Sequence, residues 1–283
     1  MTKTTTPKTT THSFDSYIYE RDIYQDPTPN TIYDSWLKHA SERDVLEEVL
    51  EKRFEEWCPY TNLSILELGC GSGSAAQRIF NILAKNNISY HYTGIDPYQD
   101  QLHRFRQSVG ENTQISLEQA TSENYVPNQT YNLALVVHSL YYVPNLAATL
   151  TKINSSANQA LIIHHGEAGI NTVQQHFQKY VKSGPNIIST HRDITNTLDQ
   201  LDINYTCQVY PTTVDIRPCK DPTNPHGRNM IKFFLEHSQL SEEIIIEVSS
   251  YFQTQPDYMQ HDMGFIITES KSPTTKKIEN YFT

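Results

Sequence analysis

Short apolar runs alternate with helical repeats through most of the chain. Mostly apolar runs that end at glycine or polar residues predict strands over 63–68, 92–96, 115–117, 131–137 and 160–163. Apolar residues recur at helical spacing over 74–85 and 101–109, so helices are predicted there. Two further strand-like runs, 205–210 and 264–268, come late in the sequence. Strands that alternate with helices predict βαβ units and a doubly wound, mostly parallel sheet, which is an α/β fold.

Two segments carry helical patterns but no strands. The first, 13–60, has a long amphipathic pattern that places these apolar residues on one face: Trp36, Leu37, Val45, Leu46, Val49, Leu50, Phe54 and Trp57. The second, 224–258, contains helical runs over 230–235 and 242–252. Both are too long to be simple connections. We therefore expect an N-terminal helical cap and a smaller helical insertion that pack together over the strand ends.

The rest of the chain divides accordingly. The strand–helix core is predicted to consist of 61–223 and 259–270. Residues 1–12 are rich in threonine and lysine and have almost no apolar anchors, so a disordered tail is expected there. Residues 271–283 have a similar polar composition and are predicted to form a C-terminal tail.

Composition and charge argue against several classes of protein. The chain has 283 residues, 37% hydrophobic and 19% charged, so neither disorder nor a membrane protein fits it as a whole. No stretch approaches the roughly 20 apolar residues of a membrane-spanning helix, and the start has no signal-peptide core. The net charge of −10, without a Lys/Arg cluster, argues against nucleic acid as a partner. Four widely spaced cysteines argue against a zinc site or disulfides. We expect a monomeric, cytoplasmic protein.

The most informative segment is the glycine loop between the first predicted strand and helix. It contains Glu67, Gly69, Gly71 and Gly73 in the order Glu-Leu-Gly-Cys-Gly-Ser-Gly. A dinucleotide-binding loop would need a third glycine at residue 74, which is serine, and the Gly-Lys-Ser/Thr ending of a P-loop is absent. The remaining spacing, with an acid two residues before the first glycine, resembles the loop of class I S-adenosylmethionine-dependent methyltransferases.

Asp96 ends the second predicted strand, on the edge of the sheet where ligands bind in open α/β folds. A carboxylate there can accept hydrogen bonds from both hydroxyls of a ribose. An NAD enzyme could use the same acid, and an unrelated α/β protein could carry a glycine turn with an exposed aspartate. Only the combination of Asp96 with the glycine spacing favours S-adenosylmethionine as the cofactor.

A longer resemblance points to the histamine N-methyltransferase family. It is carried by the run Val-His-Ser-Leu-Tyr-Tyr-Val at 137–143 with 145–150, and by weaker matches over 33–42, 96–101, 121–125, 188–201, 213–216 and 265–269. The resemblance implies a Rossmann-like methyltransferase domain with a smaller helical substrate-covering region. It also implies cofactor contacts for the glycine loop and for Asp96, Gln101, Thr121, Ser122 and Val137.

On the substrate side, the resemblance implies that Glu42 holds a nitrogenous ring between aromatic residues. Tyr141 and Tyr142 match the family's aromatic wall, and Phe177 falls where another aromatic residue is expected. Glu42, His138 and Tyr142 are the candidates for catalysis. The bland alternatives are that the tyrosines pack the sheet edge and that Glu42 lies on a solvated helix face.

Two histidines depart from the family's pattern. His138 aligns with a glutamine and His261 with an asparagine, and His164 and His165 end the fifth predicted strand. A histidine cluster could bind a carboxylate-bearing substrate when protonated or a metal when neutral, or each histidine could simply make one ordinary hydrogen bond. We take the last reading as the default and expect no metal, with His165 and His261 contacting the substrate.

These features predict an enzyme that methylates a small molecule. The leading hypothesis is N-methylation of an amine or an imidazole-like compound other than histamine. Because imidazoles could suit an anionic substrate, O-methylation of a small carboxylic acid or phenol remains open. A catalytically silent methyltransferase fold is the third possibility, although the intact glycine loop argues against it.

Overall fold

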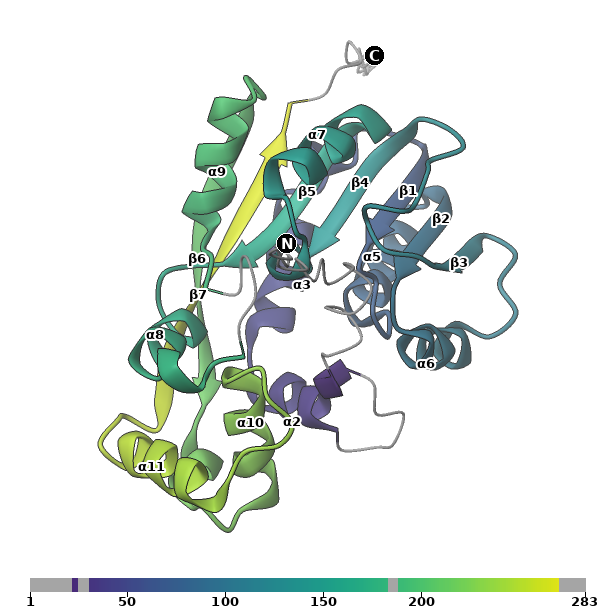
Figure 1. Cartoon of the computed structure of the whole chain (residues 1–283). Helices are drawn as coiled ribbons and strands as arrows, with labels where there is room; N and C mark the ends of the chain where they lie inside the picture. Colours follow the sequence, from purple (N-terminus) through teal and green to yellow (C-terminus); the bar gives the residue numbers. More distant parts are fainter. Residues whose placement is uncertain (1–21, 25–30, 183–187, 270–283) are drawn as a thin grey trace, which may run out of the picture.

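The computed structural model describes residues 22–24, 31–182 and 188–269. The predicted tails, 1–12 and 271–283, lie outside these residues, as does part of the predicted cap. The described chain forms a seven-stranded sheet with the order β3-β2-β1-β4-β5-β7-β6 (Figure 1). The strands are β1 (Asn62–Leu68), β2 (Ser89–Asp96), β3 (Ile115–Gln119), β4 (Tyr131–Val137), β5 (Ala157–His165), β6 (Tyr205–Asp215) and β7 (Tyr258–Thr268). β7 runs antiparallel to both of its neighbours. The predicted α/β, mostly parallel sheet is confirmed.

Helices cover both faces of the sheet because the central strands bury both faces. Leu133, Leu135 and Val137 of β4 point to one face, and Ala134 and Val136 point to the other. The first face packs against α3 (Glu42–Lys52), α4 (Phe54–Trp57), α5 (Ser74–Lys85) and α6 (Gln99–Val109). The second face packs against α7 (Leu146–Ser156) and α9 (His191–Gln200). This two-sided burial explains why these strands read as continuous apolar runs.

A third apolar core lies beyond the ends of the sheet. It joins the short turn η1 (Asp22–Tyr24) to α2 (Ile32–His39), α8 (Ile170–His176), η4 (Arg217–Lys220), α10 (Pro225–Phe234) and α11 (Glu242–Gln253). We call this group of elements the cap; its helices lie together at the lower end of the sheet in Figure 1. Two 3₁₀ turns, η2 (Leu140–Tyr142) and η3 (Gln178–Tyr180), complete the described helical elements.

Local sequence signals define several ends of the cap helices. Thr31 and Asp34 form a capping box at the start of α2, in which each side chain accepts from the other residue's backbone N–H. Asn224 caps α10 through its side chain, and Pro225 occupies the first turn, where no N–H partner is needed. Both helices therefore begin directly after a polar capping residue, Thr31 for α2 and Asn224 for α10.

The cap stands on a two-stranded arm. β5 pairs with β7 only from Met263 to Ile267, whereas β6 and β7 remain paired as far as Asp215 and Tyr258. The far half of the β6–β7 ribbon therefore projects past the sheet. η4, α10 and α11 are inserted between the two strands at its tip.

The packing differs from the predicted division in two respects. The described part of 13–60 does not act as one layer, because α2 packs on α10 whereas Leu46, Leu50 and Trp57 of α3 and α4 join the core under the sheet. Conversely, α8 belongs to the cap although it lies within the predicted core. Amphipathic periodicity shows that a helix has a buried face, but it does not show what covers that face.

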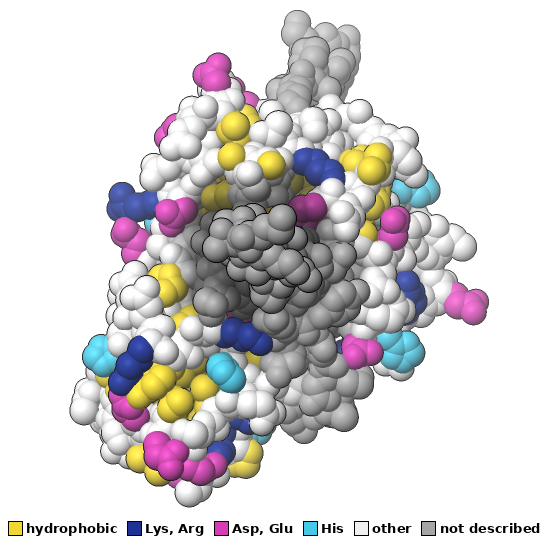
Figure 2. Space-filling model, viewed as in Figure 1, with side chains coloured by type: hydrophobic (Ala, Val, Ile, Leu, Met, Phe, Trp, Pro, Cys, Tyr) yellow, Lys and Arg dark blue, Asp and Glu magenta, His cyan; other side chains and the backbone are white. Residues whose placement is uncertain are grey.

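The visible surface carries charges of both signs. Figure 2 shows Lys and Arg side chains standing apart from one another among Asp and Glu on this face. Among the described residues, no helix is both long enough and apolar enough to cross a membrane.

The cap should unfold together with the sheet rather than as an independent domain. Phe252 of α11 is fully buried in the cap core, so Phe252→Ala is expected to cost about 3–5 kcal/mol of stability. Ile246 on the same helix is 52% exposed, so Ile246→Ala should change stability by less than about 0.5 kcal/mol. Urea unfolding followed by fluorescence and circular dichroism should show one shared transition. Two separate transitions in the wild-type protein would show instead that the cap is autonomous.

Candidate active site

A deep cavity lies at the carboxyl ends of β1, β2 and β4, where the strand order reverses. Leu68, Asp96 and Val137, the last residues of these three strands, line it, and Trp36 and Phe233 of the cap also contribute to the lining. It holds about 1350 Å³ of empty space when its open mouth is included. That is enough for two small molecules side by side, at the position where open α/β sheets bind ligands.

The glycine loop has a backbone that glycine adopts most readily. The φ angle is +73° at Gly69, +53° at Gly71 and +82° at Gly73. A Cβ added to Gly69 would lie 2.4 Å from Cβ of Ser139, and one on Gly73 would lie 2.5 Å from the ring of Phe105. A Cβ on Gly71 would meet no atom within 4 Å. The loop therefore leaves an open cradle beside Gly71, next to the first turn of α5.

Asp96 lies next to this cradle. Its Oδ2 accepts the N–H of Gly71 at 2.8 Å, and its Oδ1 accepts the N–H of Tyr98 at 2.9 Å. Burial raises the pKa of Asp96 to about 6, although both N–H groups favour the ionised form. Each carboxylate oxygen can accept a further hydrogen bond, so a pair of ribose hydroxyls would fit here.

The other predicted cofactor residues also line the cavity. They are Glu67, Gln101, Thr121, Ser122 and Val137. Gln101 is buried; its Nε2 donates to the carbonyl of Tyr24 at 2.7 Å, while its Oε1 has no hydrogen-bond partner among the described residues. A buried acceptor without a partner at the cavity wall is what a bound ligand with a donor group would satisfy.

Glu67 is the buried acid at the end of β1. It accepts a hydrogen bond from the hydroxyl of Tyr92. Burial raises the pKa of Glu67 to about 8, against the opposing effects of Tyr92 and Arg43. A cationic group bound nearby would favour the ionised form of Glu67.

The other end of the cavity is organised around Glu42, the first residue of α3. The edge of β6 fixes its position, because Ala40 forms a β-bridge with Val214. The N–H of Ser41 donates to the carbonyl of Thr213 at 2.9 Å. α3 therefore starts at a strand edge, and its first side chain is directed into the protein, where it is 2% exposed.

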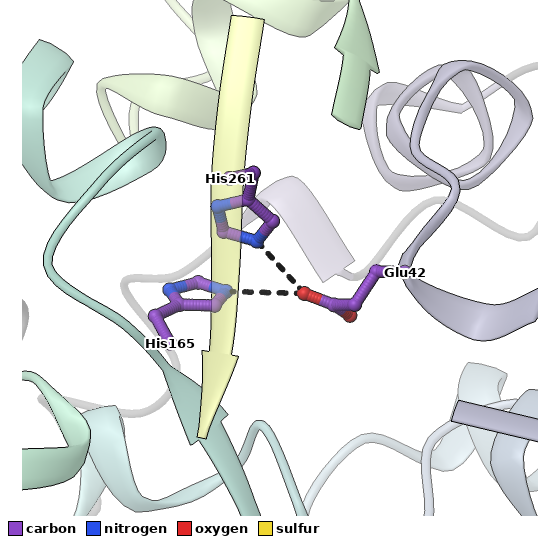
Figure 3. A group of neighbouring side chains, drawn as sticks. All are labelled: Glu42, His165 and His261. Atoms are coloured by element: carbon purple, nitrogen blue, oxygen red, sulfur yellow. Dashed lines mark hydrogen bonds and ion pairs between the residues drawn. The ribbon is translucent and has the colours of Figure 1, made fainter. Parts of the chain in front are cut away.

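Three imidazoles and one guanidinium surround this carboxylate. Arg43 donates from Nη1 to Oε1 of Glu42 at 2.9 Å, and Nε2 of His138 lies 2.9 Å from the same oxygen. Nε2 of His261 lies 2.8 Å from Oε2, and Nε2 of His165 lies 4.0 Å from it. Figure 3 shows Glu42, His165 and His261 pointing toward one another from separate elements.

Burial and these neighbours set the charges of the cluster. Burial alone would raise the pKa of Glu42, but His138, His261 and Arg43 together hold it well below its usual value. Burial lowers the pKa of His138 and that of His165, outweighing the attraction of Glu42. Glu42 is therefore a carboxylate near neutral pH, whereas His138 and His165 are neutral. These two histidines do not supply the positive charge that would favour an anionic substrate.

His138 directly follows β4 in an unusual conformation. Its φ is +52°, a left-handed value that few residues other than glycine adopt. Its Nδ1 lies 3.0 Å from the hydroxyl of Tyr141, which also accepts the backbone N–H of His165 at 2.7 Å. The strained turn and this hydrogen bond direct the imidazole toward Glu42 and the cavity.

Tyr142 faces a second buried carboxylate that the sequence did not reveal. Its hydroxyl donates to Oε1 of Glu236 at 3.0 Å and lies 2.6 Å from the hydroxyl of Tyr24. Glu236 is 6% exposed, lines the cavity and has a φ of +53°. Its position just after α10 was the only signal in the sequence, and that signal is weak. Further cavity residues that were missed from the sequence include Tyr24, Tyr33, Arg43 and Phe233.

Two predicted substrate contacts do not reach the cavity wall. Phe177 is buried in the cap core, where its ring packs on that of Tyr251. His261 is fully buried behind Glu42, with its ring edge-on to Trp36 at 5.4 Å. His138, Tyr141, Tyr142 and His165 do line the cavity.

The strand order, the glycine cradle and Asp96 together define a class I S-adenosylmethionine-dependent methyltransferase. Comparison with known families agrees, since the family model described as "Methyltransferase domain" matches residues 35–180, slightly more than half of the chain. The chain belongs to this methyltransferase family. It is an enzyme whose cofactor is S-adenosylmethionine, as predicted from the glycine loop.

Curated relatives are distant but cover most of the chain. The chain is 23% identical to histamine N-methyltransferase of Bos taurus in an alignment 225 residues long, which covers 71% of this chain and 77% of that protein. It is 22% identical to the Mus musculus enzyme over 280 residues, covering 83% of this chain and 92% of that protein. The sequence resemblance to this group is therefore reproduced at low identity.

Solved structures share the fold. Magnesium protoporphyrin IX methyltransferase from Synechocystis PCC 6803, with bound S-adenosylhomocysteine, has a TM-score of 0.51 at 12% identity, covering 91% of this chain and 96% of that one. A phosphoethanolamine N-methyltransferase from Haemonchus contortus has a TM-score of 0.52 at 14% identity, covering 80% of this chain and 53% of that one. At these identities the likeness concerns the fold alone.

The open space beside Gly71 should be essential for binding the cofactor. Gly71→Ala and Gly110→Ala both place a side chain on a residue with positive φ and open space around it, so each should destabilise the fold by about 1–3 kcal/mol. Only the Gly71 variant fills the cradle, and we expect it to bind S-adenosylhomocysteine at least about tenfold more weakly, or about 1.4 kcal/mol. Isothermal titration compares the two variants. Equal binding by both would remove Gly71 from the cofactor site.

The buried Glu67 should make the protein less stable as pH rises. Its pKa of about 8 lies above the ordinary value of 4.5, so the folded state retains a proton that the unfolded chain releases. Stability should fall between about pH 4.5 and 8, by at most about 1.4 kcal/mol per pH unit from this group. Glu67→Gln should flatten the slope in urea unfolding at pH 5, 6.5 and 8. The exposed Glu118→Gln serves as control, and an unchanged slope in Glu67→Gln would contradict the assignment.

Proposed function

We propose that this methyltransferase N-methylates a small amine or an imidazole-like compound. The observation that carries the proposal is the composition of the cavity beyond the cofactor cradle. Aromatic residues line it together with two buried acids: Tyr24, Tyr33, Trp36, Tyr141, Tyr142, Phe233, Glu42 and Glu236. Flat or cationic nitrogen compounds are held by stacking and cation–π attraction in such surroundings.

The charge of the acceptor end supports nitrogen over carboxylate oxygen as the atom that is methylated. Glu42 is ionised, and the two flanking histidines with lowered pKa values, His138 and His165, are neutral. Because the charge of Arg43 is paired with that of Glu42, this group supplies no net positive charge to hold an anionic acceptor. The names of the histamine N-methyltransferases among the relatives agree with a nitrogen acceptor, although the two amide positions of that family are His138 and His261 here.

The cofactor would be held by the glycine loop, Asp96 and Gln101, and when bound it supplies an electrophilic methyl group on a sulfonium sulfur. The protein's own contribution is positioning and the exclusion of water, which can be worth about 7–11 kcal/mol as effective concentration. Tyr141 and Tyr142 would orient the acceptor against the strand ends. A nitrogen must be neutral to attack, so a proton has to leave it. His138, whose neutral imidazole lines the cavity, would accept that proton, because Glu42 with its lowered pKa is the weaker base.

The test is methyl transfer by the purified full-length chain. We expect S-adenosylmethionine to be consumed with amines or imidazoles from a mixed panel, giving N-methylated products by mass spectrometry, and not with carboxylic acids or phenols. Asp96→Ala should weaken cofactor binding by about 1.5–3 kcal/mol, the scale for hydrogen bonds to a charged group. Glu111→Ala, which removes an exposed acid elsewhere, is the matched control.

The outcomes separate the alternatives. Products formed only from acids or phenols would overturn N-methylation while retaining the enzyme class. A cofactor affinity that is unchanged in Asp96→Ala would remove Asp96 from the site.

A further inference from the structure

One cluster in the site contains more polar side chains around a single carboxylate than methyl transfer requires. Glu42, His165 and His261 come from α3, the end of β5 and the middle of β7, which are far apart in the sequence (Figure 3). All three are buried, and one ligand-type atom from each lies within 4.8 Å of the other two. A single carboxylate that needs one or two donors is instead faced by three imidazoles and an arginine.

The two oxygens of Glu42 have different surroundings. Oε1 is bound by Arg43 at 2.9 Å and is also approached by His138. Within the described part of the chain, the partners of Oε2 are ring nitrogens, namely Nε2 of His261 at 2.8 Å and Nε2 of His165 at 4.0 Å. In a tetrahedral or octahedral site with bonds of about 2.1 Å, neighbouring ligand atoms lie about 3.0–3.4 Å apart. The two measured distances lie on either side of that range.

We propose that Glu42, His165 and His261 bind a divalent transition-metal ion through Oε2 and the two Nε2 atoms. Two histidines and one carboxylate are a recurrent ligand set for Zn²⁺ and for non-haem Fe²⁺, and they leave coordination positions open. Two nitrogen donors make Mg²⁺ and Ca²⁺ poor candidates, because these ions prefer oxygen.

The surrounding residues hold the three ligands in place. The ring of His165 packs against those of Tyr141 and His138, with centroids 4.6 and 4.7 Å away. The ring of His261 is fixed edge-on against Trp36, and its Nδ1 side packs on the backbone of Gly169, where an added Cβ would lie 2.3 Å away. Arg43 donates to Oε1 of Glu42 and so orients the carboxylate. Residues that hydrogen-bond to the ligands play this part in metal sites.

The open positions would face the acceptor. Glu42 and His165 line the cavity, whereas His261 stands behind them, so an ion held by the three would lie at the cavity wall. Building on the function proposed above, the acceptor would then carry an oxygen or nitrogen donor that binds the ion, besides the nitrogen that is methylated. Glu42 would contact that acceptor through the ion. The ion site itself does not depend on the reaction.

The experiment is titration of the metal-free full-length protein with Zn²⁺, and with Co²⁺ as a spectroscopic probe. We expect each chain to bind one metal ion tightly. The Co²⁺-loaded protein should show the visible absorption bands of a Co²⁺ ion with a low coordination number. His165→Asn, His261→Asn and Glu42→Gln should each weaken Zn²⁺ binding by more than about 100-fold. The loss of a residue that contacts only the ligands already lowers metal affinity by about 10–100-fold, so the loss of a ligand should lower it further. Zn²⁺ should also raise the unfolding temperature of the wild type but not that of His261→Asn.

His164→Asn is the matched control, because His164 is a buried neighbour whose Nε2 faces Ser189 at 2.8 Å instead of Glu42. It should bind Zn²⁺ like the wild type. S-adenosylhomocysteine binding by each variant verifies that it is folded. Equal affinity in the wild type and the three ligand variants would overturn the proposal, since the ions would then sit on other histidines. A wild type that binds metal but not S-adenosylhomocysteine would contradict the proposed function alone.

Discussion

The rest of the site depends on one constraint, which is that Glu42 is a carboxylate almost completely removed from water. A buried charge without partners is very costly, so the protein has to bring partners to it. They arrive from Arg43 beside it, from His138 after β4, from His165 at the end of β5 and from His261 within β7. Residues from three strands and from the first turn of α3 therefore have to meet at the Glu42 carboxylate. The same constraint explains the hydrogen bond from Ser41 to the edge of β6, because a small shift of α3 would leave the charge of Glu42 unpaired.

The sequence predicted the parts of the fold that depend on local patterns. Continuous apolar runs such as β4 are readable because both faces are buried, and Gly69, Gly71 and Gly73 are readable because their left-handed backbone favours glycine. The direction of a side chain at the site depends on packing between distant segments. His261 shows this, because alternation along β7 places it on the same side as Met263 and Phe265, facing the buried layer. Phe177 lies directly after α8 and packs in the cap core with it. Glu236 lies just after α10, and the packing of that helix places it at the cavity.

The two ends of the cavity have different physical characters. At the cofactor end, backbone geometry dominates: glycines leave space, and main-chain N–H groups bind Asp96. At the acceptor end, side chains dominate, and most of them are aromatic rings, acids and histidines. The first end depends on elements that all belong to the sheet and its crossovers, whereas the second combines strand ends with the cap. The acceptor end is therefore the part whose chemistry can vary while the fold stays the same.

The two-stranded arm of β6 and β7 has a consequence for how such variation arises. The chain enters the insertion at Asp215 and leaves it at Tyr258, which are directly paired neighbours. An insertion whose ends are already held together can be lengthened, shortened or replaced without moving either strand. In this architecture the insertion that contains α10 is a module that can vary, and the paired strands β6 and β7 are the fixed stem that carries it. The buried imidazole of His261 lies in the stem itself, three residues from the junction. A change in the module would therefore alter the wall that α10 contributes to the cavity without moving His261 or the other residues around Glu42.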